Sequence, residues 1–234
     1  MLKGKKILAL IPARGGSKGI KNKNIINLHD KPLISYTINA SLKSKYIDET
    51  VVTTDSQDIA DVSLQYGASI PFLRPKSLAQ DTSKTIDAVL HAINELKKSG
   101  QKFDILILLQ PTQPLRTHID IDNALEAFMD NNYISLASVS KADDNPILIR
   151  TIDKNKNLEK LLNQKSDVRR QDMKDYYRIN GCIYINYISN INESTSFNDN
   201  KQAFVMDKMH SIDIDDNIDL LFAESIIKNN EGKL

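Results

Sequence analysis

The sequence lacks several features that define whole classes of protein. Cys182 is the single cysteine among 234 residues, so the chain can form neither an internal disulfide nor a cysteine-rich zinc site. The 31 Lys and Arg residues nearly balance the 30 Asp and Glu residues, which leaves a formal net charge of +1. A chain without a strong net charge is not drawn as a whole to nucleic acid or to an anionic membrane. Anion binding must therefore depend on a local site.

Long apolar runs are also missing. No stretch reaches the roughly 20 apolar residues that cross a bilayer. The apolar residues 7–11 are too few for a cleavable signal sequence, and Arg and Gly residues follow them at once. With 41% hydrophobic and 26% charged residues, the composition predicts a soluble cytoplasmic globular protein with one sizeable core and one appended lobe.

Short apolar runs and helical periodicities alternate along the first 140 residues. The apolar runs predict strands over residues 6–11, 50–54, 104–109 and 135–139, and spacings of three and four predict helices over residues 33–42, 58–66, 85–98 and 119–129. Such alternation predicts right-handed crossovers and a doubly wound, mostly parallel α/β sheet with helices on both faces. Sheet character returns at residues 181–185 and 211–215, and a final helix is expected from about Asn217.

The segment 141–176 interrupts this pattern. It is polar, rich in Lys, Asn and Asp, and shows little periodicity. Because it is too long for a simple loop, it is expected to form a lobe, an arm or a partner-binding insertion. The core would then comprise residues 1–140 and 177–234.

Glycines and cations converge at the end of the first predicted strand. The run there is Ala13-Arg14-Gly15-Gly16-Ser17-Lys18-Gly19, followed by Lys21, Lys23 and Asn24. At the carboxyl end of a strand, the backbone N–H groups of a Gly-rich turn can cradle phosphate oxygens. The glycine order is neither that of a nucleotide hydrolase nor that of a dinucleotide site. We predict a phosphate-binding loop of another kind, rather than a solvated turn.

Two carboxylates stand near the other end of the sequence. In a strand over residues 211–215, Asp213 and Asp215 would point to the same face and repel each other unless a cation lay between them. Mg²⁺ held by one or two carboxylates and by substrate phosphates suits that arrangement. A calcium-binding loop would use the same aspartates, but Ile218 stands where that loop requires glycine. A solvated strand end that caps the final helix is the simpler alternative.

Two further segments offer groups that suit a polar acid. The loop Gln110-Pro111-Thr112-Gln113-Pro114-Leu115-Arg116 has two prolines that fix its shape, and amide and hydroxyl groups that suit a polyhydroxylated ligand. Arginines occur in Arg169-Arg170-Gln171 and in Arg178-Ile179-Asn180-Gly181, and arginine can bind a carboxylate through two hydrogen bonds. Each pattern alone is also compatible with a polar turn or with solvated arginines.

In this order the motifs resemble the N-acylneuraminate cytidylyltransferases, or CMP-sialic acid synthetases, a family that includes CMP-legionaminic acid synthetases. The resemblance covers residues 7–222. Besides the motifs above, it rests on Thr53-Thr54-Asp55, Leu73-Arg74-Pro75, Leu78-Ala79-Gln80-Asp81-Thr82 and Ile183-Tyr184-Ile185. The Gly-Gly-Ser-Lys-Gly order fits the neuraminate and legionaminate enzymes better than the pseudaminate or octulosonate ones.

The resemblance implies a Rossmann-like core with residues 141–176 as a small dimerisation lobe, which reaches into the partner's active site in a homodimer. It implies that catalysis depends on Arg14, Lys23, Asp213 and Asp215, with Mg²⁺ held by the two aspartates. The nucleotide contacts implied are Ala13, Arg14, Gly15, Ser17, Lys23, Asn24, Arg74, Ser83 and Thr85. The sugar contacts implied are Gln110, Arg170, Gln171 and Tyr184, with Arg170 meeting the carboxylate.

The implied reaction joins CTP to a nonulosonic acid, with N-acetylneuraminic and legionaminic acids both compatible. The anomeric hydroxyl attacks the α-phosphate and pyrophosphate leaves, while Mg²⁺, Arg14 and Lys23 neutralise the charge that develops. The alternatives are a pseudaminate or 3-deoxy-manno-octulosonate cytidylyltransferase, a metal-dependent glycosyltransferase and a sugar-nucleotide sensor. A glycosyltransferase would release a nucleoside diphosphate and a sensor would release nothing, so pyrophosphate release separates the classes.

Overall fold

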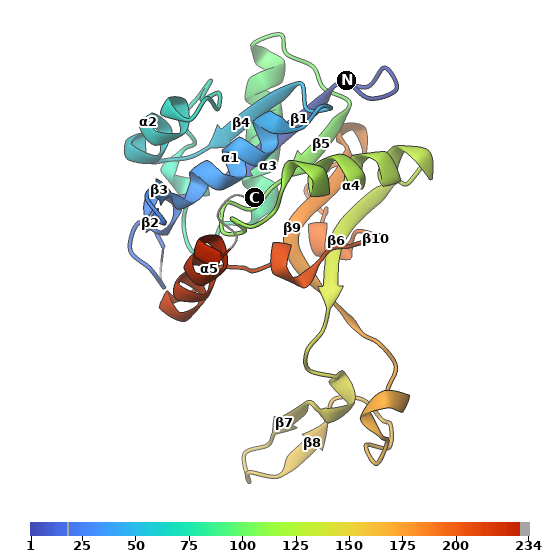
Figure 1. Cartoon of the computed structure of the whole chain (residues 1–234). Coiled ribbons are helices and arrows are strands. Elements are labelled where there is room, and N and C mark those ends of the chain that lie inside the picture. The colour runs from blue at the N-terminus through green and yellow to red at the C-terminus, as the bar shows by residue number, and fades with distance from the viewer. Residues whose placement is uncertain (18, 230–234) are drawn as a thin grey trace.

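A computed structural model describes residues 1–17 and 19–229, with Arg170 described by its backbone alone. Its centre is a six-stranded sheet with the strand order β10-β6-β9-β5-β1-β4 (Figure 1). The strands are β1 (Ile7–Pro12), β4 (Glu49–Thr53), β5 (Ile105–Leu108), β6 (Ser135–Lys141), β9 (Tyr177–Tyr187) and β10 (Gln202–Val205). β1 pairs in parallel with β4 and β5, and β6 with β10, while β9 runs antiparallel between β5 and β6. The predicted mostly parallel α/β sheet is confirmed.

The helices lie close to their predicted positions. They are α1 (Leu33–Lys43), α2 (Gln57–Gln65), α3 (Thr85–Lys98), α4 (His118–Asp130) and α5 (Asn217–Asn229). A short hairpin, β2 (Asn27–Leu28) with β3 (Lys31–Pro32), precedes α1. No helix in the described part of the chain is long and apolar enough to cross a membrane.

Residues of β1 alternate between the two faces of the sheet, and all of them up to Ile11 are fully buried. Ile7, Ala9 and Ile11 pack in a cluster with residues of α1, α2 and α4. Leu8 and Leu10 pack on the other face with residues of α3. This double burial explains why the strand reads as a continuous apolar run, and it confirms that helices cover both faces.

The C-terminal part of the chain differs from the prediction in two places. β10 forms an edge strand that was not predicted. It has only four residues, and none of them is fully buried. Residues 211–215, predicted as a strand, are an irregular segment and belong to no sheet. That prediction was wrong because the alternation of Ile and Asp is not matched by a neighbouring strand. Ile214 N–H donates to Thr112 O at 2.9 Å, and this isolated backbone hydrogen bond is not part of a strand ladder.

The segment between β6 and β9 forms an arm that projects away from the core (Figure 1). It contains a two-stranded hairpin, β7 (Arg150–Ile152) with β8 (Leu158–Lys160). Ile152 and Leu158 on this hairpin are each 69% exposed. The assignment of residues 141–176 to a dimerisation lobe stays a prediction.

Candidate functional site

A cavity of about 450 Å³ opens at the carboxyl ends of β1 and β5. This edge of an open α/β sheet is where ligands bind. Its wall is formed by the loops after both strands, by the segment before α3 and by Asp215, which lies two positions before α5. The lining residues are Pro12, Arg14, Ser17, Gly19, Lys23, Asn24, Arg74, Leu78, Gln80, Asp81, Ser83, Lys84, Thr85, Ala88, Gln110, Pro111, Thr112 and Asp215. We call it the nucleotide cavity, after the ligand that the family resemblance implies for its residues.

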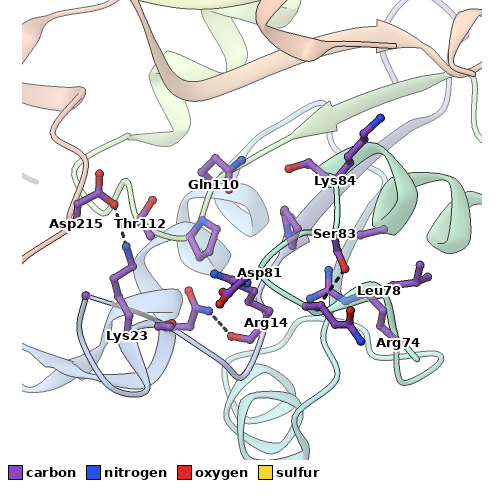
Figure 2. Close-up of a pocket in the computed structure, with 18 residues that line it drawn as sticks. Arg14, Lys23, Arg74, Leu78, Asp81, Ser83, Lys84, Gln110, Thr112 and Asp215 are labelled. Carbon is purple, nitrogen blue, oxygen red and sulfur yellow. Dashed lines mark hydrogen bonds and ion pairs between the residues drawn. The ribbon is translucent and has the colours of Figure 1, made fainter. Parts of the chain in front are cut away.

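Arg14 lies on the floor of the nucleotide cavity, and its backbone is held on two sides. Asn24 Nδ2 donates to Arg14 O at 2.9 Å, and the N–H of Gly15 donates to Asp55 Oδ1 at 2.9 Å. The Arg14 guanidinium forms an ion pair of 2.8 Å with Asp81 on the opposite loop (Figure 2). The glycine loop is therefore anchored, and its cation reaches across the cavity.

Lys23 links the glycine loop to the segment before α5. Its Nζ donates to Ile214 O at 2.8 Å and to Asp215 Oδ1 at 3.0 Å (Figure 2). Gly19 also approaches this segment closely, since a Cβ on Gly19 would lie 2.5 Å from the carbonyl oxygen of Asp215. Residues nearly 200 positions apart in the sequence thus meet at one edge of the cavity.

Replacing Gly19 with alanine is expected to raise the KM for the nucleotide about tenfold. The added Cβ cannot remain 2.5 Å from a backbone oxygen, so the loop or the Asp215 segment must move away. A change of this size corresponds to about 1.4 kcal/mol of binding. Gly16, whose Cβ would meet no atom within 4 Å, supplies the matched control Gly16→Ala. Equal KM values for both variants would contradict the prediction.

Arg74 is a buried cation in the wall of the cavity. Its guanidinium lies 3.8 Å from Asp55, while its Nε is shielded from solvent and has no hydrogen-bond partner in the part of the chain that the structure describes. Burial lowers the pKa of Arg74, an effect that the negative charge of Asp55 opposes. Arg74 lines the cavity, and the guanidinium of a lining arginine is suited to a ligand acceptor such as a base carbonyl or ring nitrogen.

Asp213 and Asp215 flank the fully buried Ile214 and both remain exposed to solvent. Desolvation by surrounding protein atoms is the main effect that raises the pKa of Asp213, and the charge of Asp215 raises it further, whereas a hydrogen bond with Thr112 lowers it. No group of three or more His, Cys, Asp or Glu side chains suited to a metal occurs among the described residues. Two neighbouring carboxylates beside the predicted phosphate-binding loop nevertheless suit Mg²⁺ by their oxygen donors, because this ion normally keeps water and substrate phosphates in its remaining positions.

A second cavity of about 290 Å³ adjoins the first and shares Lys84, Thr85 and Gln110 with it. Its other lining residues are Ile86, Leu108, Tyr184, Thr195, Ser196, Phe197 and Asn198. The Tyr184 hydroxyl donates to Asn198 Oδ1 at 2.6 Å, and burial raises the pKa of Tyr184 to about 12. These hydroxyl and amide groups, beside apolar residues and Lys84, suit a polyhydroxylated ligand. We call this the acceptor cavity.

The structure brings together most of the predicted site residues. Arg14, Ser17, Lys23, Asn24, Arg74, Ser83, Thr85, Gln110 and Asp215 line the nucleotide cavity, and Tyr184 lines the acceptor cavity. Ala13 is fully buried behind the loop, and Gly15 and Asp213 stand next to lining residues without lining the cavity themselves. Lys18 lies outside the described residues.

The arm carries two predicted sugar contacts, of which Gln171 lines neither cavity of its own chain. Gln171 is exposed there in a 3-10 turn, and the side chain of Arg170 lies outside the described part of the chain. Gln113, read from the sequence as a ligand contact, is fully buried, and its Nε2 donates to Asn180 O at 2.6 Å. That interpretation of Gln113 was wrong because the loop turns this side chain into the core.

Sequence reasoning missed Lys84 and the residues 195–198 of the acceptor cavity. Lys84 has one local signal, its place between two polar residues directly before a helix that packs on the sheet. Residues 195–198 have none, because they come from an irregular segment that reaches the cavity only through the fold.

Comparison with known proteins gives one consistent result. Residues 8–227 match the sequence profile of a family described as Cytidylyltransferase. The chain is 40% identical to CMP-N,N'-diacetyllegionaminic acid synthase of Legionella pneumophila, over 98% of this chain and 99% of that protein. It is 35% identical to N-acylneuraminate cytidylyltransferase of Escherichia coli, over 98% of this chain and 54% of that protein. The solved structure of CMP:2-keto-3-deoxy-manno-octonic acid synthetase complexed with CTP shares the fold, with a TM-score of 0.70 at 16% identity over 96% of this chain and 99% of that one.

Proposed function

Because this chain belongs to the cytidylyltransferase family, we propose that it transfers the cytidylyl group of CTP to a nonulosonic acid and releases pyrophosphate. The observation that carries the proposal is the pair of adjoining cavities. One has cations suited to a triphosphate, and the other has hydroxyl and amide groups and one cation, which together suit a sugar acid. We further propose N,N'-diacetyllegionaminic acid as the acceptor to test first, since the relative named for that product aligns along nearly the whole of both chains.

In the proposed reaction, the anomeric hydroxyl of the acceptor attacks the α-phosphorus of CTP. A C–O–P bond forms as the bond from the α-phosphorus to the bridging oxygen of pyrophosphate breaks, and the hydroxyl proton passes to solvent. Arg14 and Lys23 exchange their carboxylate partners, Asp81 and Asp215, for phosphate oxygens. Catalysis then depends mainly on positioning and on neutralisation of charge.

Asp213 and Asp215 are the residues that would hold Mg²⁺. When bound, the ion would supply charge neutralisation for the phosphates. Arg74 is proposed to meet the cytosine through its guanidinium, with Ser83 and Thr85 near the ribose. Gln110 borders both cavities and is placed to contact the acceptor beside the nucleotide.

The experiment that tests this proposal is pyrophosphate release from CTP and Mg²⁺, run in parallel with N,N'-diacetyllegionaminic, N-acetylneuraminic, pseudaminic and 3-deoxy-manno-octulosonic acids. We expect release with the first or second acid and none without Mg²⁺. Release of CMP from a CMP-sugar, or of a nucleoside diphosphate from a nucleoside-diphosphate sugar, would instead indicate a glycosyltransferase. CTP binding without turnover of any acid would indicate a sensor.

We also propose a homodimer built through the arm. The arm projects from its own core, its hairpin exposes Ile152 and Leu158, and it carries Arg170 and Gln171 away from the cavities of its own chain. These residues would act in the partner's site. Sedimentation equilibrium should give twice the chain mass of 26.4 kDa, and a Leu158→Asp variant should give the monomer. A monomeric wild type would contradict this proposal.

A further inference from the structure

Three cations that line the nucleotide cavity are paired with carboxylates of the protein. Arg14 pairs with Asp81 at 2.8 Å and Lys23 with Asp215 at 3.0 Å, and Arg74 lies 3.8 Å from Asp55. Lys84 is different. Its ammonium group has no carboxylate or hydrogen-bond partner within residues 1–17 and 19–229. An unpaired cation in a cavity wall is available to an anionic ligand.

Lys84 stands where the two cavities meet. It precedes α3 directly and lines both cavities, a property that it shares with Thr85 and Gln110. In Figure 2 its side chain points away from Arg14 and Asp81, and therefore away from the cations assigned to the triphosphate. The position favours a ligand that reaches from one cavity into the other.

Lys84 is also the single charged side chain in the described lining of the acceptor cavity. The other lining residues are hydroxyl, amide or apolar, and the Tyr184 phenol stays neutral because burial raises its pKa to about 12. An anionic group of the acceptor therefore has one cation to meet on the wall of this cavity.

The covalent structure of the proposed acceptor determines where its carboxylate must lie. A nonulosonic acid carries its carboxylate on the same carbon as the anomeric hydroxyl. When that hydroxyl oxygen approaches the α-phosphate, the carboxylate lies close by, because it is attached to the carbon that bears the attacking oxygen. This places the carboxylate at the junction of the cavities. We infer that Lys84 binds the carboxylate of the acceptor acid there and orients the anomeric hydroxyl toward the α-phosphate. This inference rests on the proposed function. Lys84 belongs to the core of the same chain as the two cavities, whereas the proposed carboxylate contact of Arg170 would be made in the partner's site.

The test compares Lys84→Gln with Lys97→Gln, a control that removes one exposed cation from the far end of the same helix. Each variant is assayed by pyrophosphate release with the acceptor acid and with its C1 carboxamide. We expect Lys84→Gln to raise the KM for the acid about tenfold, the usual order for one charge-assisted hydrogen bond. The KM for CTP should stay unchanged. The preference of the wild type for the acid over the carboxamide should shrink by the same factor, and Lys84→Arg should restore part of it.

If Lys84 had only a structural role, its loss would weaken binding of the acid and of the carboxamide equally. An unchanged preference for the acid over the carboxamide in Lys84→Gln would therefore overturn the inference. An unchanged KM for the acid would overturn it as well. The wild type in the same assay separates this failure from failure of the proposed function. If the wild type turns over an acid and Lys84→Gln has no effect, only the role of Lys84 is refuted. No turnover by the wild type with any acid removes the proposed function, and this inference with it.

Discussion

Replacing Asp215 with alanine is expected to lower kcat for pyrophosphate release by about 10² or more, the usual loss when a group that stabilises charge in the transition state is removed. Asp215 lines the nucleotide cavity and is one of the two carboxylates proposed to hold Mg²⁺. It also accepts the hydrogen bond from Lys23, so the variant releases that lysine from its anchor beside the glycine loop. Both effects misplace positive charge at the phosphates.

A readout other than turnover separates these effects from unfolding. CTP with Mg²⁺ should raise the melting temperature of the wild type above the value with CTP alone, and Asp215→Ala should lose that additional rise. Asp58→Ala, which removes an exposed carboxylate in the first turn of α2, should keep both the rise and the activity. Wild-type kcat in Asp215→Ala would refute the assignment of the metal.

Replacing Arg116 with methionine is expected to lower the free energy of unfolding by about 3 kcal/mol. Arg116 is almost completely buried, and it donates to Cys182 O at 2.9 Å, to Gln110 O at 3.3 Å and to Thr37 Oγ1 at 2.7 Å. Burial lowers the pKa of Arg116 to about 10, so it stays protonated at neutral pH. Its hydrogen bonds tie α1, the loop after β5 and β9 together beneath the site.

Exchange of a buried ion pair for an apolar residue is often neutral, because the cost of burying the charges disappears with them. Arg116 differs, since its acceptors are carbonyl and hydroxyl oxygens that remain buried after the exchange. Methionine fills the volume of the stem but donates no hydrogen bond. Urea unfolding should show a lower midpoint with an unchanged m-value. Arg150→Met in the arm, which removes hydrogen bonds to Ile147 O and Ile149 O, should leave the midpoint of the core unchanged. A full wild-type midpoint in Arg116→Met would contradict the prediction.

Much of the candidate site could be predicted because its signals are local. Arg14, Lys23 and Asn24 follow a strand whose end is marked by Pro12, and parallel strands present their carboxyl ends at one edge. The tight approach of Gly19 to Asp215 and the pairing of Arg14 with Asp81 could not be predicted, because they join loops that are far apart in the sequence. The same limit hid residues 195–198.

The sequence by itself determined the order and type of the main elements, since β1, α1 and α3 depend on apolar periodicities that a short window contains. It also determined which chemical groups stand at the strand ends. Only the tertiary structure decided which of those groups face a ligand. Gln110 and Gln113 are three positions apart, yet one lines both cavities and the other is buried against Asn180. The direction of a loop side chain is set by the contacts available to it in three dimensions, and no periodicity encodes those contacts.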